Sequence, residues 1–237
     1  MAGDVVLGVA EQTAAAAREW AIRRAESRGA TLREVVIGPA RDDVDAVAAA
    51  LGDAEILVLS GEDDRHHRAL IAAAARPVAI VPESAPSPAL ITGPSSGAGV
   101  LVGVDETEVS ARALQFAASE ARDRGVTLTA LAAWEPVPFG AEPGVGLSTA
   151  PLPVDLSDAT AAMLERMLEP VRETHPDLEI RSRVEVGSAA LMIAEASADA
   201  ALTVVGSHGR TGLARLLLGS VSEHVVEHVH TPTVVVP

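Results

Sequence analysis

Short apolar runs alternate with longer Ala-rich segments along the whole chain. The runs at 5–10, 56–59 and 202–205 are too short for helices and lack polar alternation, which is typical of buried strands. Other segments, such as 14–28 and 110–124, carry apolar residues at helical spacing, and a glycine follows each of these two. Alternating strands and helices favour a parallel sheet that is covered by helices. We therefore predict an α/β fold.

The pattern occurs twice, and the second occurrence is the longer one. Residues 6–9 (Val-Leu-Gly-Val) match residues 101–104 (Leu-Val-Gly-Val), and the end of each half has a similar Pro- and Val-containing segment. Between the halves lies a stretch with three prolines and too few apolar side chains to pack. Each half should form its own parallel sheet with right-handed crossovers. We predict a shortened first domain at 1–83, a linker at 84–97 and a complete second domain at 98–237.

The chain is strongly acidic and contains neither Lys nor Cys. Its formal charge is −15, and all 18 basic residues are Arg. The lack of Lys excludes a phosphate-loop lysine, and the lack of Cys excludes disulfides and thiolate metal sites. An acidic chain without a basic run is a poor partner for nucleic acid. Apolar stretches are too short to span a membrane and the first residues are unlike a signal peptide, so we expect a soluble, cytoplasmic protein.

A glycine-rich turn follows the apolar run at 202–205. Gly206-Ser207-His208-Gly209 comes directly after the run, and Gly219-Ser220 lies inside a segment that we predict as the last helix, 212–228. Glycines allow the backbone to approach an anion, and N–H groups at a helix start point towards it. Ligands of open α/β sheets bind at the carboxyl ends of strands, and Asp105 ends another predicted strand.

The sequence therefore predicts a phosphate site at this edge of the sheet. The alternative is a turn that only connects a strand to a helix and binds no phosphate, with Asp105 as a helix cap. Such a turn would use the same residue types. His208 lies inside the turn and could contact phosphate or face solvent.

Four residues of this region resemble a nucleotide-binding pattern of the universal stress protein family, G-x2-G-x9-G-[S/T]: Gly206, Gly209, Gly219 and Ser220. The resemblance covers residues 98–237, and residues 3–83 resemble a degenerate copy. It implies Rossmann-like domains that pair through their last strands. The similar ends of the two halves then imply an intramolecular pseudo-dimer, which could dimerise again as a homo-oligomer.

The resemblance implies an adenine-nucleotide site, with ATP, with or without Mg²⁺, as the cofactor. Asp105 would meet the adenosine, and the backbone of Ala133 would contact the adenine. The glycine turn would hold the phosphates, and Arg210 beside it could add positive charge. The predicted cofactor-binding residues are Asp105, Ala133, Gly206, Gly209, Arg210, Gly219, Ser220 and Ser222.

Two features depart from the family pattern. Glu106 and Thr107 follow Asp105 where the family often has Gly-Ser, and an inward-facing Glu106 would weaken the binding of an anion. In the first half, Ala10 stands at the position of Asp105, and acidic residues at 62–64 lie where the glycine turn should be. We therefore expect no nucleotide in the first half.

These observations predict an ATP-binding universal stress protein that acts in stress-response regulation or signalling. We expect no catalytic residues and at most slow ATP hydrolysis, with a regulatory protein as a further partner and no nucleic-acid or membrane partner. The alternative is a protein-interaction scaffold of the same fold that binds no nucleotide. A weaker alternative is an enzyme of the related adenine-nucleotide α-hydrolase-like group, for which the sequence shows no second substrate site.

Residues 224–228 spell H-x-x-E-H, an inverted zinc-protease motif. The nine residues that follow hold no carboxylate to complete a zinc site. We therefore expect a solvated helix face at this motif and no metal.

Overall fold

The computed structural model describes residues 3–9, 15–37, 47, 49, 51–61, 64–83, 98–136, 155–208, 218–228 and 230–237. For residues 64–67 it describes the backbone only. The predicted linker at 84–97 lies outside the described residues.

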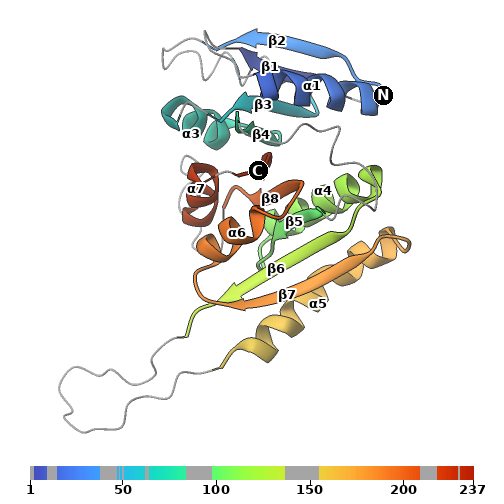
Figure 1. The fold of residues 1–237 in the computed structure, drawn as a ribbon, viewed down its shortest axis with the longest axis vertical. Coiled ribbons are helices and arrows are strands. Elements are labelled where there is room, and N and C mark those ends of the chain that lie inside the picture. The colour runs from blue at the N-terminus through green and yellow to red at the C-terminus, as the bar shows by residue number, and fades with distance from the viewer. Residues whose placement is uncertain are drawn as a thin grey trace, which may run out of the picture.

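Within these residues, nine strands form one sheet (Figure 1). The order across the sheet is β2-β1-β3-β4-β9-β8-β5-β6-β7, and every neighbouring pair is parallel except β4 and β9. The strands are β1 (Val5–Val9), β2 (Leu32–Val36), β3 (Ile56–Ser60), β4 (Val78–Val81), β5 (Val100–Gly103), β6 (Leu128–Trp134), β7 (Ile180–Val186), β8 (Leu202–Gly206) and β9 (Thr233–Val236). The predicted α/β fold with a mostly parallel sheet is confirmed.

Helices cover both faces of this sheet. One face packs against α1, α4 and α5, and the opposite face packs against α3, α6 and α7 (Figure 1). The helices are α1 (Ala15–Arg28), α3 (Asp64–Ala73), α4 (Glu108–Arg124), α5 (Ser157–Thr174), α6 (Ala189–Ser197) and α7 (Ser220–Glu227).

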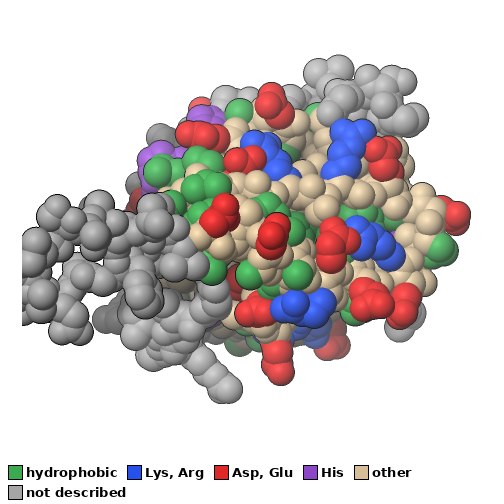
Figure 2. Space-filling model, turned by 90° about the horizontal axis from the view of Figure 1, so that it is seen from below, with side chains coloured by type: hydrophobic (Ala, Val, Ile, Leu, Met, Phe, Trp, Pro, Cys, Tyr) green, Lys and Arg blue, Asp and Glu red, His purple; other side chains and the backbone are tan. Residues whose placement is uncertain are grey.

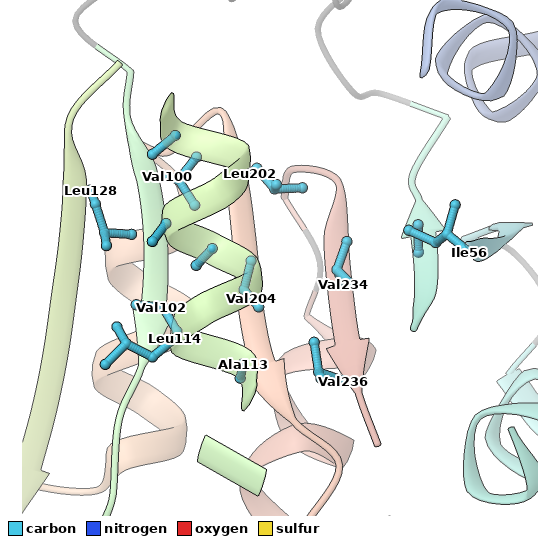
Figure 3. Close-up of a cluster of buried hydrophobic side chains, with 14 of the residues drawn as sticks. Ile56, Val100, Val102, Ala113, Leu114, Leu128, Leu202, Val204, Val234 and Val236 are labelled. Carbon is cyan, nitrogen blue, oxygen red and sulfur yellow. The ribbon is translucent and has the colours of Figure 1, made fainter. Parts of the chain in front are cut away.

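Side chains along each strand alternate between the two faces. Val100 and Val102 of β5 belong to the core under α4, whereas Leu101 belongs to the core on the other face. Figure 3 shows Val100 and Val102 lying against α4, from which Ala113 and Leu114 reach into the same cluster. Because helices cover both faces of the sheet, the side chains that point to either face must be apolar. This explains the continuous apolar runs in the sequence.

β4 and β9 join the two halves of the chain. They pair antiparallel, with Val78 opposite Val235 and Ile80 opposite Thr233. The sequence predicted a sheet in each half, and the structure instead has one continuous sheet. Both strands are buried along their whole length, so their backbone N–H and C=O groups need protein partners, which this pairing supplies.

The last helix is shorter than predicted. α7 begins at Ser220, because Gly219 before it is extended, with φ −65° and ψ 150°. The prediction of a helix over 212–228 is therefore wrong at its start, where Leu218 and Gly219 are not helical. Residues 209–217 lie outside the described residues.

A buried ion cluster holds α1 of the first half against α4 of the second. Arg24 Nη2 lies 2.5 Å from Glu55 Oε1, and Arg24 Nη1 lies 2.7 Å from Glu120 Oε2. The guanidinium carbon is 5.6 Å from the ring centroid of Trp20 and 5.5 Å from that of Phe116, which adds cation–π attraction. The cluster thus links the halves by charge on one side of the sheet.

Glu120 is the acidic centre of this cluster and is 2% exposed. Burial alone would raise the pKa of its carboxyl group, but the positive charges of Arg24, Arg124 and Arg28 lower that pKa to about 2. The carboxylate is therefore stabilised as an anion although it is removed from water.

A second ion pair links the halves on the opposite face. Arg68 Nη1 of α3 lies 3.0 Å from Glu223 Oε1 and 2.9 Å from Glu227 Oε1 of α7. These side chains are 36–43% exposed, so water and salt screen their attraction much more strongly than that of the buried cluster.

Replacement of Arg24 by Met should lower the free energy of unfolding by about 3 kcal/mol, because it leaves Glu120 buried without its main partner. The matched control is Arg68→Met, which breaks the exposed ion pair and should cost less than about 1 kcal/mol. Urea unfolding followed by circular dichroism measures both losses. Equal losses would contradict a special role for the buried cluster.

The stability that Glu120 contributes should be lost in acid. Its pKa is lowered from 4.5 to about 2 in the folded protein, so its contribution is fully present above pH 4.5 and disappears as the pH falls towards 2. Because other carboxyl groups titrate as well, the quantity to measure is the difference in unfolding free energy between the wild type and Glu120→Gln. This difference should shrink over the same pH interval, and a difference that stays constant would refute the prediction.

Candidate functional site

The carboxyl ends of β5, β6 and β8 meet the start of α7 around a cavity of about 220 Å³. Parallel strands place their carboxyl ends at one edge of a sheet, so residues from distant parts of the sequence come together here. α6 contributes a further wall through Ala189 and Ile193.

Most of the predicted binding residues line this cavity. The structure brings together six of the eight: Asp105, Ala133, Gly206, Gly219, Ser220 and Ser222. The other two, Gly209 and Arg210, lie outside the described residues. That these residues bind a nucleotide stays a prediction.

The turn that starts α4 holds the carboxylate of Asp105 in place. Its Oδ1 atom accepts hydrogen bonds from the backbone N–H of Thr107 at 3.0 Å and from the Thr107 hydroxyl group at 2.6 Å. The backbone N–H of Asp105 donates to Ser110 Oγ at 2.9 Å. Thr107 is also the N-cap of α4, since its side chain accepts from the N–H of Ser110. Asp105 therefore presents an oriented carboxylate at the cavity.

Glu106 points away from the cavity. Its Oε1 atom lies 2.9 Å from Arg166 Nη2 of α5, and both side chains are more than half exposed. The sequence left open whether this acid would repel a bound anion. Because Glu106 pairs with α5 and does not line the cavity, its charge is partly neutralised at the surface.

The two ends of the glycine turn are bonded to each other and to β9. The backbone N–H of Ser207 donates to the carbonyl oxygen of Val236 at 2.7 Å, and the N–H of Gly219 donates to the carbonyl oxygen of Ser207 at 2.8 Å. The hydroxyl group of Ser222 donates to the carbonyl oxygen of Gly206. Ser222 is 3% exposed, so its hydroxyl group is used mainly to hold the turn.

The start of α7 opens onto the cavity without a side-chain cap. Its N-cap is Gly219, which has no side chain that could accept from the first turn. The first N–H groups of a helix have no acceptor within the helix. Ser220 and Val221 lie in this first turn and line the cavity, so their N–H groups can serve an anion.

The sequence analysis missed the apolar wall of the cavity. Ile193 packs so closely on Gly103 that a Cβ atom at Gly103 would lie 2.5 Å from Ile193 Cδ1. Leu131 and Val205 extend this wall. A glycine inside a strand often marks such a close approach, so Gly103 was the signal that could have revealed it.

His208 also lines the cavity. Its Nδ1 atom lies 2.9 Å from Ser207 Oγ. Its Nε2 atom is buried and has no hydrogen-bond partner in the described part of the chain. The sequence suggested either a phosphate contact or a solvent-facing side chain, and the structure places the ring at the cavity.

In the first half, an isoleucine fills the space that corresponds to this wall. Gly8 stands in β1 where Gly103 stands in β5, and a Cβ atom at Gly8 would collide with Ile37, which directly follows β2. Residues 10–14 and 62–63 lie outside the described residues. The absence of a nucleotide from the first half stays a prediction.

A larger cavity of about 770 Å³ lies at the opposite, amino-terminal ends of β5, β6 and β7. The C-terminal ends of α4, α5 and α6 face it, and helix C-termini disfavour anions. Its Arg181 pairs with Glu179 at 2.6 Å. Figure 2 shows acidic and basic side chains interspersed at the end of the molecule that carries β7 and α5. This cavity is therefore less suited to phosphate than the smaller one.

The H-x-x-E-H motif lies at the C-terminal end of α7, with His228 as the C-cap of the helix. The rings of His224 and His228 stack at a centroid distance of 4.1 Å, and Glu227 pairs with Arg68. The described residues contain no group of three or more His, Cys, Asp or Glu side chains arranged to hold a metal ion. Among the described helices, none is long and apolar enough to cross a membrane.

Known proteins with similar sequences are universal stress proteins. A universal stress protein of Mycolicibacterium smegmatis is 38% identical over 137 residues, which cover 58% of this chain and 45% of that protein. Universal stress protein Rv2005c of Mycobacterium tuberculosis is 39% identical over 138 residues, which cover 58% of this chain and 45% of that protein. The chain thus spans about half the length of the curated relatives it matches.

Solved structures show the same fold. A universal stress protein from Archaeoglobus fulgidus superimposes with a TM-score of 0.58 at 18% identity. The superposition covers 90% of this chain and 72% of the Archaeoglobus chain. The functionally unknown protein PA1789 from Pseudomonas aeruginosa superimposes with a TM-score of 0.57 at 18% identity. This superposition covers 98% of this chain and 82% of the Pseudomonas chain.

The model of the universal stress protein family matches residues 99–237, which is more than half of the chain. This chain therefore belongs to the universal stress protein family.

Proposed function

We propose that this universal stress protein binds ATP or a related adenine nucleotide in the cavity between β5, β6, β8 and α7. The observation that carries the proposal is the meeting of an oriented acid, an apolar wall and an uncapped helix start in one cavity of about 220 Å³. Asp105 suits the ribose hydroxyl groups, the wall around Ile193 suits the adenine, and the N–H groups at Ser220 suit a phosphate.

The proposed site holds a nucleotide without lysine. Backbone N–H groups bind phosphate at the start of α7, and Arg210 of the glycine turn can add charge. Asp105 is the only carboxylate among the described lining residues, so Mg²⁺ would be held mainly by the phosphates. The proposed role is to hold the nucleotide, with at most slow hydrolysis, in stress-response signalling with a regulatory protein partner. A cytoplasmic location stays a prediction.

The first half is proposed to be a degenerate copy of the second. Read towards the junction, β2-β1-β3-β4 of the first half has the same order as β6-β5-β8-β9 of the second half, which has β7 as an additional outer strand. The antiparallel pair β4 and β9 then relates the halves as a pseudo-dimer within one chain. In this arrangement the first half is a structural partner of the nucleotide-binding half.

A scaffold that binds no nucleotide is the second candidate. The formal charge of −15 favours it, because net acidity opposes an anionic ligand. The other argument for it was an inward-facing Glu106, and that argument is weakened by the pairing of Glu106 with Arg166.

Asp105→Asn should weaken the binding of both adenosine and ATP about tenfold or more. The Asn oxygen can keep the hydrogen bonds from Thr107, but the new NH₂ group cannot accept from a ribose hydroxyl group, and a hydrogen bond to a charged group contributes about 1.5–3 kcal/mol. The matched control, Glu106→Gln, removes the same charge one residue away and should bind like the wild type. Calorimetric titration of nucleotide-free protein measures the affinities of the wild type and both variants for each of the two ligands.

Two results of this titration would overturn the proposal. One is a wild type that binds neither ligand. The other is an Asp105→Asn variant with the affinity of the wild type.

Each chain should bind one nucleotide, because the glycine turn occurs in the second half of the sequence and described residues of that half line the cavity beside it. Mass spectrometry of the small molecules released by denaturing the purified protein should identify an adenine nucleotide, and titration should give a ratio of one per chain. Gly219→Asp places a carboxylate at the start of α7 and should abolish the binding. A ratio of two per chain would show that the first half also binds.

A further inference from the structure

The hydroxyl group of Thr107 is bonded on both sides, and this assigns the direction of its proton. Its Oγ1 atom accepts from the backbone N–H of Ser110 at 3.1 Å and lies 2.6 Å from Asp105 Oδ1. A hydroxyl group has one proton to donate, whereas an ionised carboxylate can only accept. The proton of Thr107 is therefore donated to Asp105, while a lone pair of the same oxygen receives the N–H of Ser110.

A closed ring of hydrogen bonds surrounds this hydroxyl group. The backbone N–H of Thr107 donates to the same Oδ1 atom at 3.0 Å, and the backbone N–H of Asp105 donates to Ser110 Oγ at 2.9 Å. Ser110 is 4% exposed and lies in the first turn of α4, so the ring is anchored on the helix. Thr107 is β-branched, which restricts its side chain to few rotamers. The orientation of the Asp105 carboxylate is thus set by the start of α4.

The protein uses one oxygen of this carboxylate and leaves the other one open. Both bonds from Thr107 end on Oδ1, and Oδ2 has no hydrogen-bond or ion-pair partner among the residues that the structure describes. Asp105 lines the cavity, whereas Thr107 does not, so the oxygen that Thr107 leaves open is the one available to a ligand.

The charges around the cavity select the kind of group that Oδ2 can bind. The chain has no Lys, and the described lining residues include no Arg that would neutralise Asp105. The nearby Arg166 pairs instead with Glu106. A carboxylate oxygen without a cation repels phosphate and accepts from a neutral hydroxyl group. Oδ2 therefore suits a hydroxyl donor of the sugar.

We propose that Thr107 is a positioning residue that makes the nucleotide site selective for an intact ribose. By holding Oδ1, it keeps Oδ2 directed at the ribose hydroxyl groups, so nucleotides without these groups bind more weakly. Thr107 itself does not touch the ligand. The inference rests on the proposed nucleotide binding, and it adds a selectivity for the sugar and the residue on which that selectivity depends.

The probes for this inference are ATP and 2′,3′-dideoxy-ATP, which differ only in the two ribose hydroxyl groups. The wild type should bind ATP about tenfold or more tightly than the dideoxy analogue, since a hydrogen bond to a charged group is among the stronger ones. Calorimetric titration measures both affinities. Their ratio reports the ribose contact alone, because adenine and phosphates are the same in both ligands.

The matched variants are Thr107→Val and Thr107→Ser. Val has the shape of Thr but no hydroxyl group, so Oδ1 of Asp105 keeps only the backbone N–H and the carboxylate is free to rotate. Loss of this preorganisation should weaken ATP binding about threefold to tenfold, with the affinity for dideoxy-ATP unchanged. Ser keeps the hydroxyl group and should bind both ligands nearly as the wild type does.

A control must separate positioning from stability, because Thr107 is also the N-cap of α4. Asp155→Ala removes a comparable acceptor, since Asp155 Oδ1 accepts from the N–H of Ser157 at the start of α5. Both Thr107→Val and Asp155→Ala should unfold at lower urea concentration than the wild type. Only Thr107→Val should lower the ratio of the two affinities.

A double variant tests whether Thr107 acts through Asp105. In an Asp105→Asn background, Thr107→Val should cause little further loss of ATP affinity, because the acceptor that it positions is already gone. Full additivity of the two losses would contradict the inference.

The outcomes separate this inference from the proposed function. If Thr107→Val weakens both ligands equally, or if Thr107→Ser is as weak as Thr107→Val, the positioning role of the hydroxyl group is refuted. A wild type that binds both ligands equally well refutes the ribose selectivity, and the nucleotide site stands. This measurement needs no variant, so it decides even if Thr107→Val does not fold. A wild type that binds neither ligand removes the proposed function and this inference together.

Discussion

The hydrogen-bonded position of β9 between β4 and β8 is the constraint on which the rest of the structure depends. On one side β9 pairs antiparallel with β4 and so joins the halves into one sheet. On the other side it pairs parallel with β8, where Val236 lies opposite Gly206, and its carbonyl oxygen accepts from Ser207. The same strand therefore fixes both the junction and the glycine turn, and the geometry of the cavity follows from the way the halves are joined.

The helices reinforce this junction with charges of two kinds. On one face the halves meet through Arg24 and Glu120, which are almost fully buried. Removing such charges from water is costly, and the cluster compensates with several guanidinium groups around one carboxylate. On the other face Arg68 meets α7 at the surface, where attraction is weak. The pairing of the strands and the buried cluster thus hold the two halves together, while the exposed ion pair at α7 contributes little.

The sequence predicted those features that depend on local patterns. The apolar runs gave the strands, and their order along the chain placed Asp105 and the glycine turn at one edge of the sheet. Features that depend on distant contacts were not predictable. Arg24 looks like any other helical arginine until Glu120 is brought beside it. The Leu-rich segment before Gly219 continues a helical pattern, so only the extended backbone of that glycine shows where α7 begins. The direction of Glu106 likewise depends on Arg166 of another helix.

The internal pairing of β4 with β9 also limits how copies of this chain can assemble. Both neighbours of β9 in the sheet belong to the same chain, so its backbone groups are not open to a second copy. The outer strands of the sheet are β2 and β7. Along β7 the charged side chains of Arg181 and Arg183, with their Glu partners, oppose the addition of another strand. Extension of the sheet by a second copy is therefore opposed at β9, whose neighbours are internal, and at β7, whose edge is charged.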